Sequence, residues 1–258
     1  MLKNYIKVAL RNLNKNRIFA IINILGLSLG LAISLIVFLY VKNELSYDKH
    51  NEGAERIYRI GIVANMMGQS MNAPVSSSPA AQTLRTEFDE VESATRFQSI
   101  SQEIYLKNEE NGFYLPVGIR ADSTFFKIFT YNFIYGDPLT ALKEENAIVI
   151  TDKTAKLFFN DENPMGKIIN YDNRQDYIVR GVVEEPKENS HFHADFILAD
   201  NQIQHIWISN SYSTYFKLKE NVDPQEFKVK MEANFLEKIK PDVEKYIGEE
   251  IEDFLKNN

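Results

Sequence analysis

Residues 18–41 form an uninterrupted apolar run, and this run constrains the fold more than any other feature of the chain. Its 24 residues, IFAIINILGLSLGLAISLIVFLYV, include no Asp, Glu, Lys or Arg. As an α-helix such a run is about 36 Å long, which is enough to cross a hydrocarbon layer of about 30 Å with some tilt. The sequence therefore predicts one transmembrane helix over residues 18–41.

The charges on either side of this run predict its orientation. Five of the 29 Lys and Arg residues precede it, whereas all 36 Asp and Glu residues follow it. Residues 42–258 thus hold 24 basic and 36 acidic residues, a net charge of −12. Because basic flanks stay in the cytoplasm, we expect an inner-membrane protein with a cytoplasmic N-terminus and a periplasmic or otherwise extracytoplasmic main domain.

A cleaved signal peptide is the alternative to a retained anchor, because it also combines a basic start with an apolar run. The apolar part of a signal peptide is usually about 7 to 15 residues long and leads to a cleavage site between small residues. The run here is longer and ends in Tyr40-Val41, followed by Lys42. An uncleaved anchor fits better, and cleavage near residue 42 would remove the membrane attachment.

Residues 1–17 have the pattern of a basic amphipathic helix. Apolar residues recur at spacings of four, four and three, and Lys3, Lys7 and Lys15 fall on another side; the apolar positions are Leu2, Ile6, Leu10 and Leu13. Such a helix can lie in the cytoplasmic interface of the membrane. The alternative, equally weighted, is that these residues only supply the positive charge that orients the span.

Small residues form a stripe along one face of the expected span. Gly26, Gly30 and Ser34 recur every four residues, and such stripes let a second helix approach closely. We therefore take these three residues as a candidate helix-packing interface. Because the sequence has no second apolar run of 18 or more residues, the partner helix must come from another chain or from sequence that is missing here.

Residues 42–258 are long enough for one large domain or two small lobes with a real core. The absence of cysteine excludes a disulfide scaffold and a thiolate zinc site. The acidic charge gives this part of the chain no electrostatic attraction to nucleic acid or to anionic lipid.

Strand and helix patterns mix along residues 42–258 without regular alternation, which indicates an α+β fold. We expect strands near 56–63, 94–120 (a hairpin around 108–112), 147–150, 167–171, 176–184, 194–199 and 211–219. We expect helices at 79–88 capped by Ser78, at 121–130, at 151–159 capped by Thr151 or Asp152, from Asp223 to about 239, and over 242–258.

Eight segments, in order along nearly the whole chain, carry a family resemblance. They are LGLSLGLA (25–32), YDKHNEGAERIYR (47–59), DSTFFKIF (122–129), GDPLTAL (136–142), ITDKTAKLFF (150–159), NPMGK (163–167), YIVRGVV (177–183) and NSHFHADF (189–196). Together they resemble the N-terminal half of the MacB-like and FtsX-like permeases of ATP-binding-cassette (ABC) systems.

This resemblance implies a two-lobed periplasmic core domain over residues 42–258, with a porter-like βαβ lobe and a smaller inserted α/β lobe. It also implies a cytoplasmic partner ATPase, whose nucleotide-driven motion is relayed to the outer domain, so the chain itself would do mechanical work and no catalysis. Such permeases continue into further membrane helices, so the resemblance implies that this sequence is a fragment or a shortened product.

No catalytic, cofactor or metal residue is predicted. A phosphate-binding G-x-x-x-x-G-K-[ST] loop is absent. His191 and His193 would share one face of a strand with Asp195 and could hold zinc, but the segment also resembles a turn and strand of the family that needs no metal. The serines at 76–78 lack the G-x-S-x-G pattern of a hydrolase. Tyr5, Arg11, Tyr47 and Arg59 fit either an interface with a partner or ordinary packing within the chain.

Two hypotheses for function follow from these observations. The first is the membrane-anchored periplasmic part of an ABC-type export or mechanotransmission permease, with a cytoplasmic ABC ATPase and further permease helices or a second permease copy as partners. The second is a single-pass anchored periplasmic binding or adaptor module without transport activity. Either could contact a periplasmic substrate or an envelope protein, and neither predicts binding to nucleic acid.

Overall fold

The computed structural model describes residues 2–66, 69–100, 102–187, 189–246 and 248. The chain divides into two compact units, Met1–Tyr47 and Asp48–Asn258. Each unit is described by itself below.

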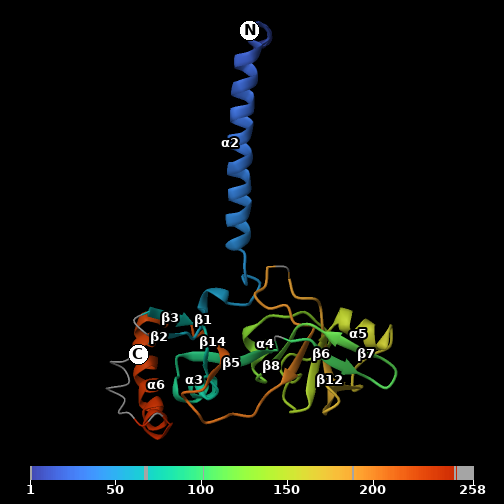
Figure 1. Cartoon of the computed structure of the whole chain (residues 1–258), viewed down its shortest axis with the longest axis vertical. Coiled ribbons are helices and arrows are strands. Elements are labelled where there is room, and N and C mark those ends of the chain that lie inside the picture. Colours follow the sequence, from blue (N-terminus) through green and yellow to red (C-terminus); the bar gives the residue numbers. More distant parts are fainter. Residues whose placement is uncertain (1, 67–68, 101, 188, 247, 249–258) are drawn as a thin grey trace. The chain divides into compact units, whose positions relative to one another are not determined.

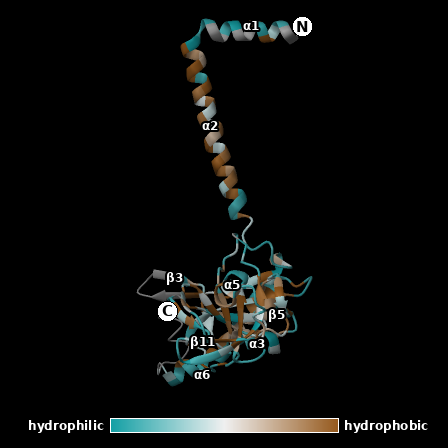
Figure 2. Cartoon of the chain, turned by 90° about the vertical axis from the view of Figure 1, so that its right-hand side faces the viewer, coloured by the Kyte–Doolittle hydropathy of each residue, from teal (hydrophilic) through white to brown (hydrophobic). Residues whose placement is uncertain are grey.

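The first unit consists of two helices, α1 (Leu2–Lys15) and α2 (Arg17–Glu44). Helix α2 begins one residue before the expected span and ends three residues after it. It buries none of its side chains within the chain, and apolar residues cover it along most of its length (Figure 2). By length and composition α2 can cross a membrane, as the sequence predicts.

The second unit is built on one 12-stranded sheet. Its strands are β1 (Ile57–Arg59), β4 (Ser76–Ser77), β5 (Val91–Ile100), β6 (Ile104–Lys107), β7 (Gly112–Leu115), β8 (Gly118–Ala121), β9 (Phe133–Gly136), β10 (Ala147–Thr151), β11 (Ile168–Tyr171), β12 (Gln175–Val183), β13 (Phe196–Ala199) and β14 (Asn210–Leu218). The order is β1-β14-β5-β8-β13-β10-β12-β11-β6-β7, with β4 beside β14 and β9 beside β12.

A separate hairpin and five helices complete the described part of this unit. The hairpin pairs β2 (Ile62–Met66) with β3 (Gln69–Ala73). The helices are the 3₁₀ turn η1 (Ala54–Arg56) and α3 (Ala80–Glu87), α4 (Phe125–Ile128), α5 (Asp152–Phe159) and α6 (Pro224–Tyr246). Figure 1 shows α3 and α6 at one end of the sheet and α5 at the other.

The chain order gives this unit two lobes on one continuous sheet. The first lobe comprises β1, β4, β5, β14, α3 and α6, and the second comprises the elements from β6 to β13, which are inserted between β5 and β14. Within the first lobe β4 and β5 flank β14 and both run antiparallel to it, so β4-α3-β5 is a βαβ unit. The α+β class and the inserted lobe that we expected are both present.

Three apolar cores stabilise the sheet. One lies under α3 and α6 in the first lobe and includes Leu84 and Phe227. Another lies under α5 in the second lobe and includes Phe158 and Ile150. The third contains Phe97 from β5 together with residues of β8, β10 and β13, so it joins the two lobes. The two lobes are therefore packed against each other as well as paired through β5 and β8.

Local sequence explains the best-predicted elements. All five residues of β10 are buried, as expected for a short apolar strand with partners on both sides. Thr151 caps α5, because its side chain accepts a hydrogen bond from the Thr154 N–H at 3.3 Å. The structure thus selects Thr151 over Asp152. The hairpin around residues 108–112 and the short aromatic helix α4 are also present.

Three expectations are wrong in detail. The strand expected at 56–63 is interrupted, because β1 ends at Arg59 and β2 pairs with β3 instead of the main sheet. Ser78 does not cap α3; Pro79 occupies that position, and the Ser78 hydroxyl is engaged by Arg96.

The third concerns the C-terminal helices. Helix α6 continues through Pro241 to Tyr246, where we expected one helix to end near 239 and another to cover 242–258. Side-chain contacts explain why the helix persists beyond the proline. Val243 is fully buried, and the Asp242 carboxylate accepts a hydrogen bond from the Trp207 N–H at 2.5 Å. Residues 247 and 249–258 of the expected second helix lie outside the described part of the chain.

Candidate functional site

The stripe of small residues on α2 leaves the backbone of this helix accessible to a neighbouring helix. A Cβ atom added at Gly26 or Gly30 would meet nothing within 4 Å in the described structure. The Ser34 hydroxyl donates to the Gly30 carbonyl at 2.8 Å, so it is satisfied within the helix and adds little bulk. These three residues therefore lie on a surface that another helix can approach closely.

The segment that follows α2, residues 48–52, is fastened to distant parts of the sheet unit, and we call it the neck. The Asp48 N–H donates to the Asn189 carbonyl at 3.0 Å, and the His191 N–H donates to Asp48 Oδ1 at 3.0 Å. The His191 ring nitrogen Nδ1 also contacts Asp48 Oδ2. The neck thus brings together two of the segments that carry the family resemblance, 47–59 and 189–196.

A second set of hydrogen bonds joins the neck to Thr130, the second residue after the end of α4. Asn51 is buried, and its Oδ1 accepts the Thr130 N–H at 2.9 Å. Its Nδ2 donates to the Asp48 carbonyl at 3.1 Å, and the Glu52 N–H donates to the Thr130 hydroxyl at 2.9 Å. Two loops that are about 60 residues apart in sequence therefore bind Asp48, Asn51 and Glu52 within one short segment. Any displacement of the neck must strain or move both loops.

Two buried polar atoms line a small cavity beside the neck. The cavity has a volume of about 50 Å³ and includes His50, Tyr131 and Lys187. His50 Nδ1 and the Tyr131 hydroxyl have no hydrogen-bond partner among the described residues. Burial lowers the pKa of His50, the positive charge of Lys187 lowers it further, and Asp48 opposes both effects. Burial raises the pKa of Tyr131, and the Asp48 charge raises it further.

The histidines that we considered as metal ligands do not lie on one strand face. Strand β13 begins at Phe196, so His191, His193 and Asp195 belong to the preceding loop. His191 faces Asp48, and the Asp195 carboxylate accepts the Val117 N–H at 3.3 Å. Among the described residues no group of three or more His, Asp or Glu could hold a metal ion.

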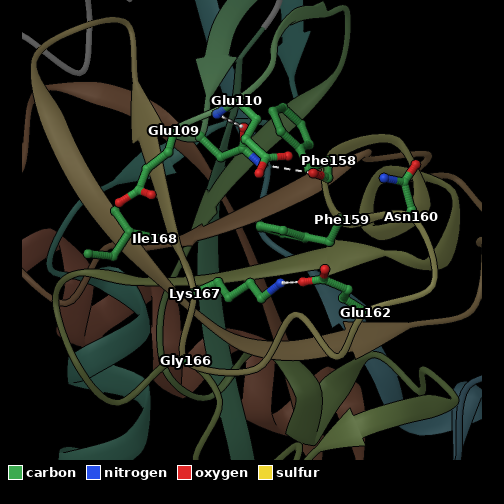
Figure 3. A pocket seen from close by; sticks show the side chains of 10 residues that line it. Glu109, Glu110, Phe158, Phe159, Asn160, Glu162, Gly166, Lys167 and Ile168 are labelled. Atoms are coloured by element: carbon green, nitrogen blue, oxygen red, sulfur yellow. Dashed lines mark hydrogen bonds and ion pairs between the residues drawn. The ribbon is translucent and has the colours of Figure 1, made fainter.

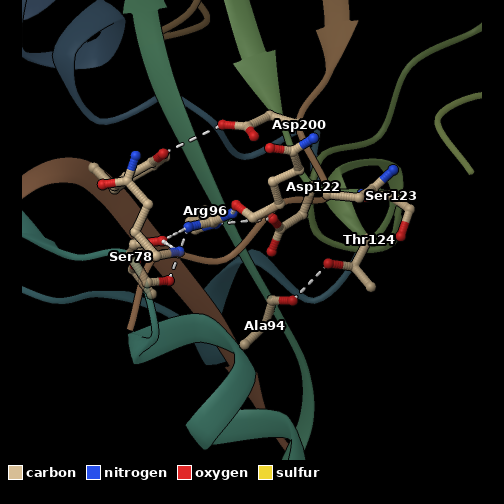
Figure 4. A network of polar contacts seen from close by, with 12 residues as sticks. Ser78, Ala94, Arg96, Asp122, Ser123, Thr124 and Asp200 are labelled. Carbon is tan, nitrogen blue, oxygen red and sulfur yellow. Dashed lines mark hydrogen bonds and ion pairs between the residues drawn. The ribbon is translucent and has the colours of Figure 1, made fainter. Parts of the chain in front are cut away.

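A buried arginine connects the two lobes (Figure 4). Arg96 on β5 is only 1% exposed, and its Nε donates to Asp122 Oδ1 at 3.0 Å. Arg85 of α3 reaches the other oxygen of Asp122 at 2.9 Å. The guanidinium of Arg96 also donates to the carbonyls of Ser78 and Gln202 and lies 4.4 Å from the centroid of the Tyr212 ring. We call this set the lobe joint.

Most of the other residues that we singled out are engaged within the sheet unit. Ser76, Ser77 and Ser78 are buried, and the Ser76 hydroxyl donates to Thr214 Oγ1 at 2.7 Å. Arg59 donates to the Pro74 carbonyl at 2.6 Å and lies over the Tyr215 ring. Those positions are therefore structural. Tyr5 and Arg11 are exposed on α1, and Tyr47 is exposed at the end of the first unit.

Another cavity lies at the far end of the second lobe. It has a volume of about 400 Å³ between the β6–β7 turn, the end of α5 and the start of β11. Figure 3 shows the Phe159 ring between Phe158 and an ion pair of Lys167 with Glu162. Lys167 Nζ lies 4.9 Å from the centroid of the Phe159 ring. We call this cavity the end pocket.

The family profile for the MacB-like periplasmic core domain matches residues 20–234. The chain belongs to this family. The MacB-like domain also resembles solved structures: a domain of a protein described as a permease from Porphyromonas gingivalis gives a TM-score of 0.59 at 21% identity, covering 72% of this chain and 86% of that one. The periplasmic region of MacB from Actinobacillus actinomycetemcomitans gives 0.50 at 15% identity, covering 79% and 94%.

At these identities the two structures establish the shared fold. None of the curated proteins is similar enough in sequence to count as a match. The sheet unit is thus a MacB-like periplasmic core domain of the kind found in ABC-type permeases, joined in the chain to an apolar helix that can anchor it in a membrane. Permease subunits of this family are generally non-catalytic.

Proposed function

We propose that this chain is the part of an ABC-type permease that relays movement from a cytoplasmic ATPase, through α2, to the sheet unit. One observation carries the proposal: the neck, which begins four residues after Glu44 at the end of α2, is bonded at Asp48 and Asn51 to the loops at 189–191 and 130. A helix that shifts or rotates in the membrane would pull on these bonds rather than on a slack linker.

The remaining parts of the proposal follow from charge and helix chemistry. The basic residues before α2 and the acidic residues after it favour a cytoplasmic N-terminus and a periplasmic sheet unit. Gly26, Gly30 and Ser34 supply the face on which a second permease copy or further permease helices pack. ATP hydrolysis takes place on the partner chain, because the sequence lacks a phosphate-binding loop.

Affinity purification from native membranes tests this function. The chromosomal gene is tagged, membranes are extracted in mild detergent, and mass spectrometry identifies the tagged chain and the proteins that accompany it. We expect a P-loop ATPase and additional membrane helices. Recovery of an intact anchored chain without any ATPase would contradict the proposal and would favour the anchored binding or adaptor module.

A further inference from the structure

Strand β7 is an open edge of the large sheet. It ends the strand order and pairs only with β6 among the described strands. Figure 1 shows β6 and β7 at the end of the sheet away from α6. An exposed edge strand can accept another strand through its free backbone groups, unless side chains or a bulge block it.

The hydrogen bonds around β6 show which backbone groups of β7 point outward. The Asn108 N–H donates to the Asn111 carbonyl at 2.9 Å, and bonded pairs alternate along an antiparallel ladder. Tyr105 lies opposite Tyr114. Its carbonyl accepts a hydrogen bond from the Asp172 N–H, which lies on the β11 side, at 2.8 Å. The N–H and C=O of Gly112 and Tyr114 therefore face the open edge, at the two-residue spacing that an added strand needs.

The end pocket adjoins the β6–β7 turn, which leads directly into this edge strand, and its lining is acidic and aromatic. The β6–β7 turn supplies Glu109 and Glu110 to its rim, and Glu162 lies across from them. The one cation on the rim, Lys167, is already paired with Glu162 and lies over the Phe159 ring. Glu162 and the Phe159 ring thus already hold one ammonium group, that of Lys167, and this leaves Glu109 and Glu110 as the carboxylates on the rim that a basic side chain from a partner could meet. Glu109 and Glu110 form no ion pair within the described part of the chain.

We propose that the β7 edge and the end pocket together dock an extended segment of a protein partner, with a basic side chain of that segment in the end pocket. Backbone bonds to Gly112 and Tyr114 supply the general affinity, and the rim carboxylates select Lys or Arg at the end of the segment nearest the β6–β7 turn. This surface is distant in sequence from α2 and from the neck, and the inference does not depend on coupling to an ATPase.

Three synthetic peptides test this docking on the full chain in detergent micelles. The first is a fluorescent octapeptide of alternating Val and Thr with Arg at both ends, so that either strand direction places Arg near the turn. The second has Glu in place of both Arg residues. The third keeps Arg and carries methyl groups on its four central amide nitrogens, which removes the backbone donors without changing the charge. Fluorescence anisotropy measures binding.

We expect the Arg peptide to bind and the other two to bind at least about tenfold more weakly. The double variant Glu109→Gln/Glu110→Gln should weaken binding of the Arg peptide by about 3- to 10-fold. Its control, Glu145→Gln/Glu244→Gln, removes the same charge from exposed positions elsewhere and should leave binding unchanged. Tyr114→Pro removes one outward N–H and should abolish binding, whereas Tyr114→Thr should retain it.

Two results would overturn the inference. One is no binding of the Arg peptide up to about 1 mM. The other is binding that survives amide methylation, which would mean that charge alone attracts the peptide, as it would any small organic cation. Because the methylated peptide is tested on the unaltered chain, this outcome can be read even if Tyr114→Pro fails to fold.

Discussion

Arg96 is a guanidinium that folding removes almost completely from water, and its partners make that possible. Asp122 neutralises it, two carbonyls and the Ser78 hydroxyl accept hydrogen bonds from its other nitrogens, and the Tyr212 ring covers its face. Asp122 itself is only 4% exposed and is shared with Arg85. Because a buried charge is tolerated only with such partners, the lobe joint should be sensitive to the loss of one member.

We predict that Asp122→Ala lowers the free energy of unfolding by about 3–5 kcal/mol, because it leaves a buried guanidinium without its counter-charge. Chemical denaturation of the full chain in detergent measures this. The control is Glu232→Ala, which removes an exposed i,i+4 partner of Lys228 and should cost less than about 1 kcal/mol. Equal effects of the two substitutions would contradict the assignment of the lobe joint.

His50 predicts a pH dependence with a definite sign. Folding lowers the pKa of His50 below 6.5, so the unfolded chain binds a proton at a higher pH than the folded chain does. The stability linked to His50 is therefore complete above about pH 6.5 and is lost as the pH falls through the folded pKa. Hydrogen bonds from Lys238, Lys230 and Arg56 lower the pKa values of Glu87, Glu90 and Glu92, so their contribution is lost at lower pH, below about 4.5.

We expect unfolding measurements from pH 8 to pH 3 to show a decline in two stages. His50→Gln should flatten the first stage, near and below pH 6.5, and leave the second unchanged. A first stage of equal slope in the wild type and in His50→Gln would show that another group causes it.

Helix α2 was readily predicted at the scale of elements because its signal is local. The same holds for β10, α5 and the β6–β7 hairpin, where adjacent residues carry the pattern. The β2–β3 hairpin was missed because residues 62–73 alternate weakly and are rich in small and polar residues. Ser78 was misassigned as a cap because its partner Arg96 lies 18 residues away.

The neck could not be predicted for the same physical reason. Asp48 and His191 are separated by 143 residues, and no local pattern shows that they meet. Arg96 did leave a signal: it is the only charged residue in the run Ala94–Ile100 of an otherwise largely buried strand, which calls for a buried acidic partner. Local patterns thus predict the elements and the motifs, but not the contacts that join them.

The stripe on α2 leads to a prediction about assembly. Gly30→Leu should weaken association with partner membrane helices by about tenfold or more, because the added side chain prevents close approach. The helix itself should remain intact, since the added atoms meet nothing in the described chain. Cross-linking or native gel analysis in mild detergent measures the association.

The matched control for that substitution is Ala32→Leu. It makes a similar increase in size two residues further on, which is about 200° around the helix. We expect it to leave association unchanged. A similar loss in both variants would indicate a general effect of bulk and would remove the special role of the Gly26, Gly30 and Ser34 face.

At the scale of the whole molecule, the chain runs from an apolar helix through the hydrogen-bonded neck into a sheet unit whose two lobes share a core. The neck is bonded at both Asp48 and Asn51, and the lobe joint and the shared core around Phe97 connect the lobes. Force applied at the neck should therefore reach both lobes. Family membership establishes the kind of domain, whereas this path of coupling is our proposal.

Hydrogen–deuterium exchange of the purified permease with its ATPase tests this central claim most directly. Exchange is compared without nucleotide, with ATP, and with a trapped nucleotide state. We predict that nucleotide changes the exchange of peptides covering the neck and the loops at 130 and 189–191, where the Asp48 and Glu52 amides are hydrogen-bonded. Identical exchange throughout residues 42–258 in all three states would contradict the claim.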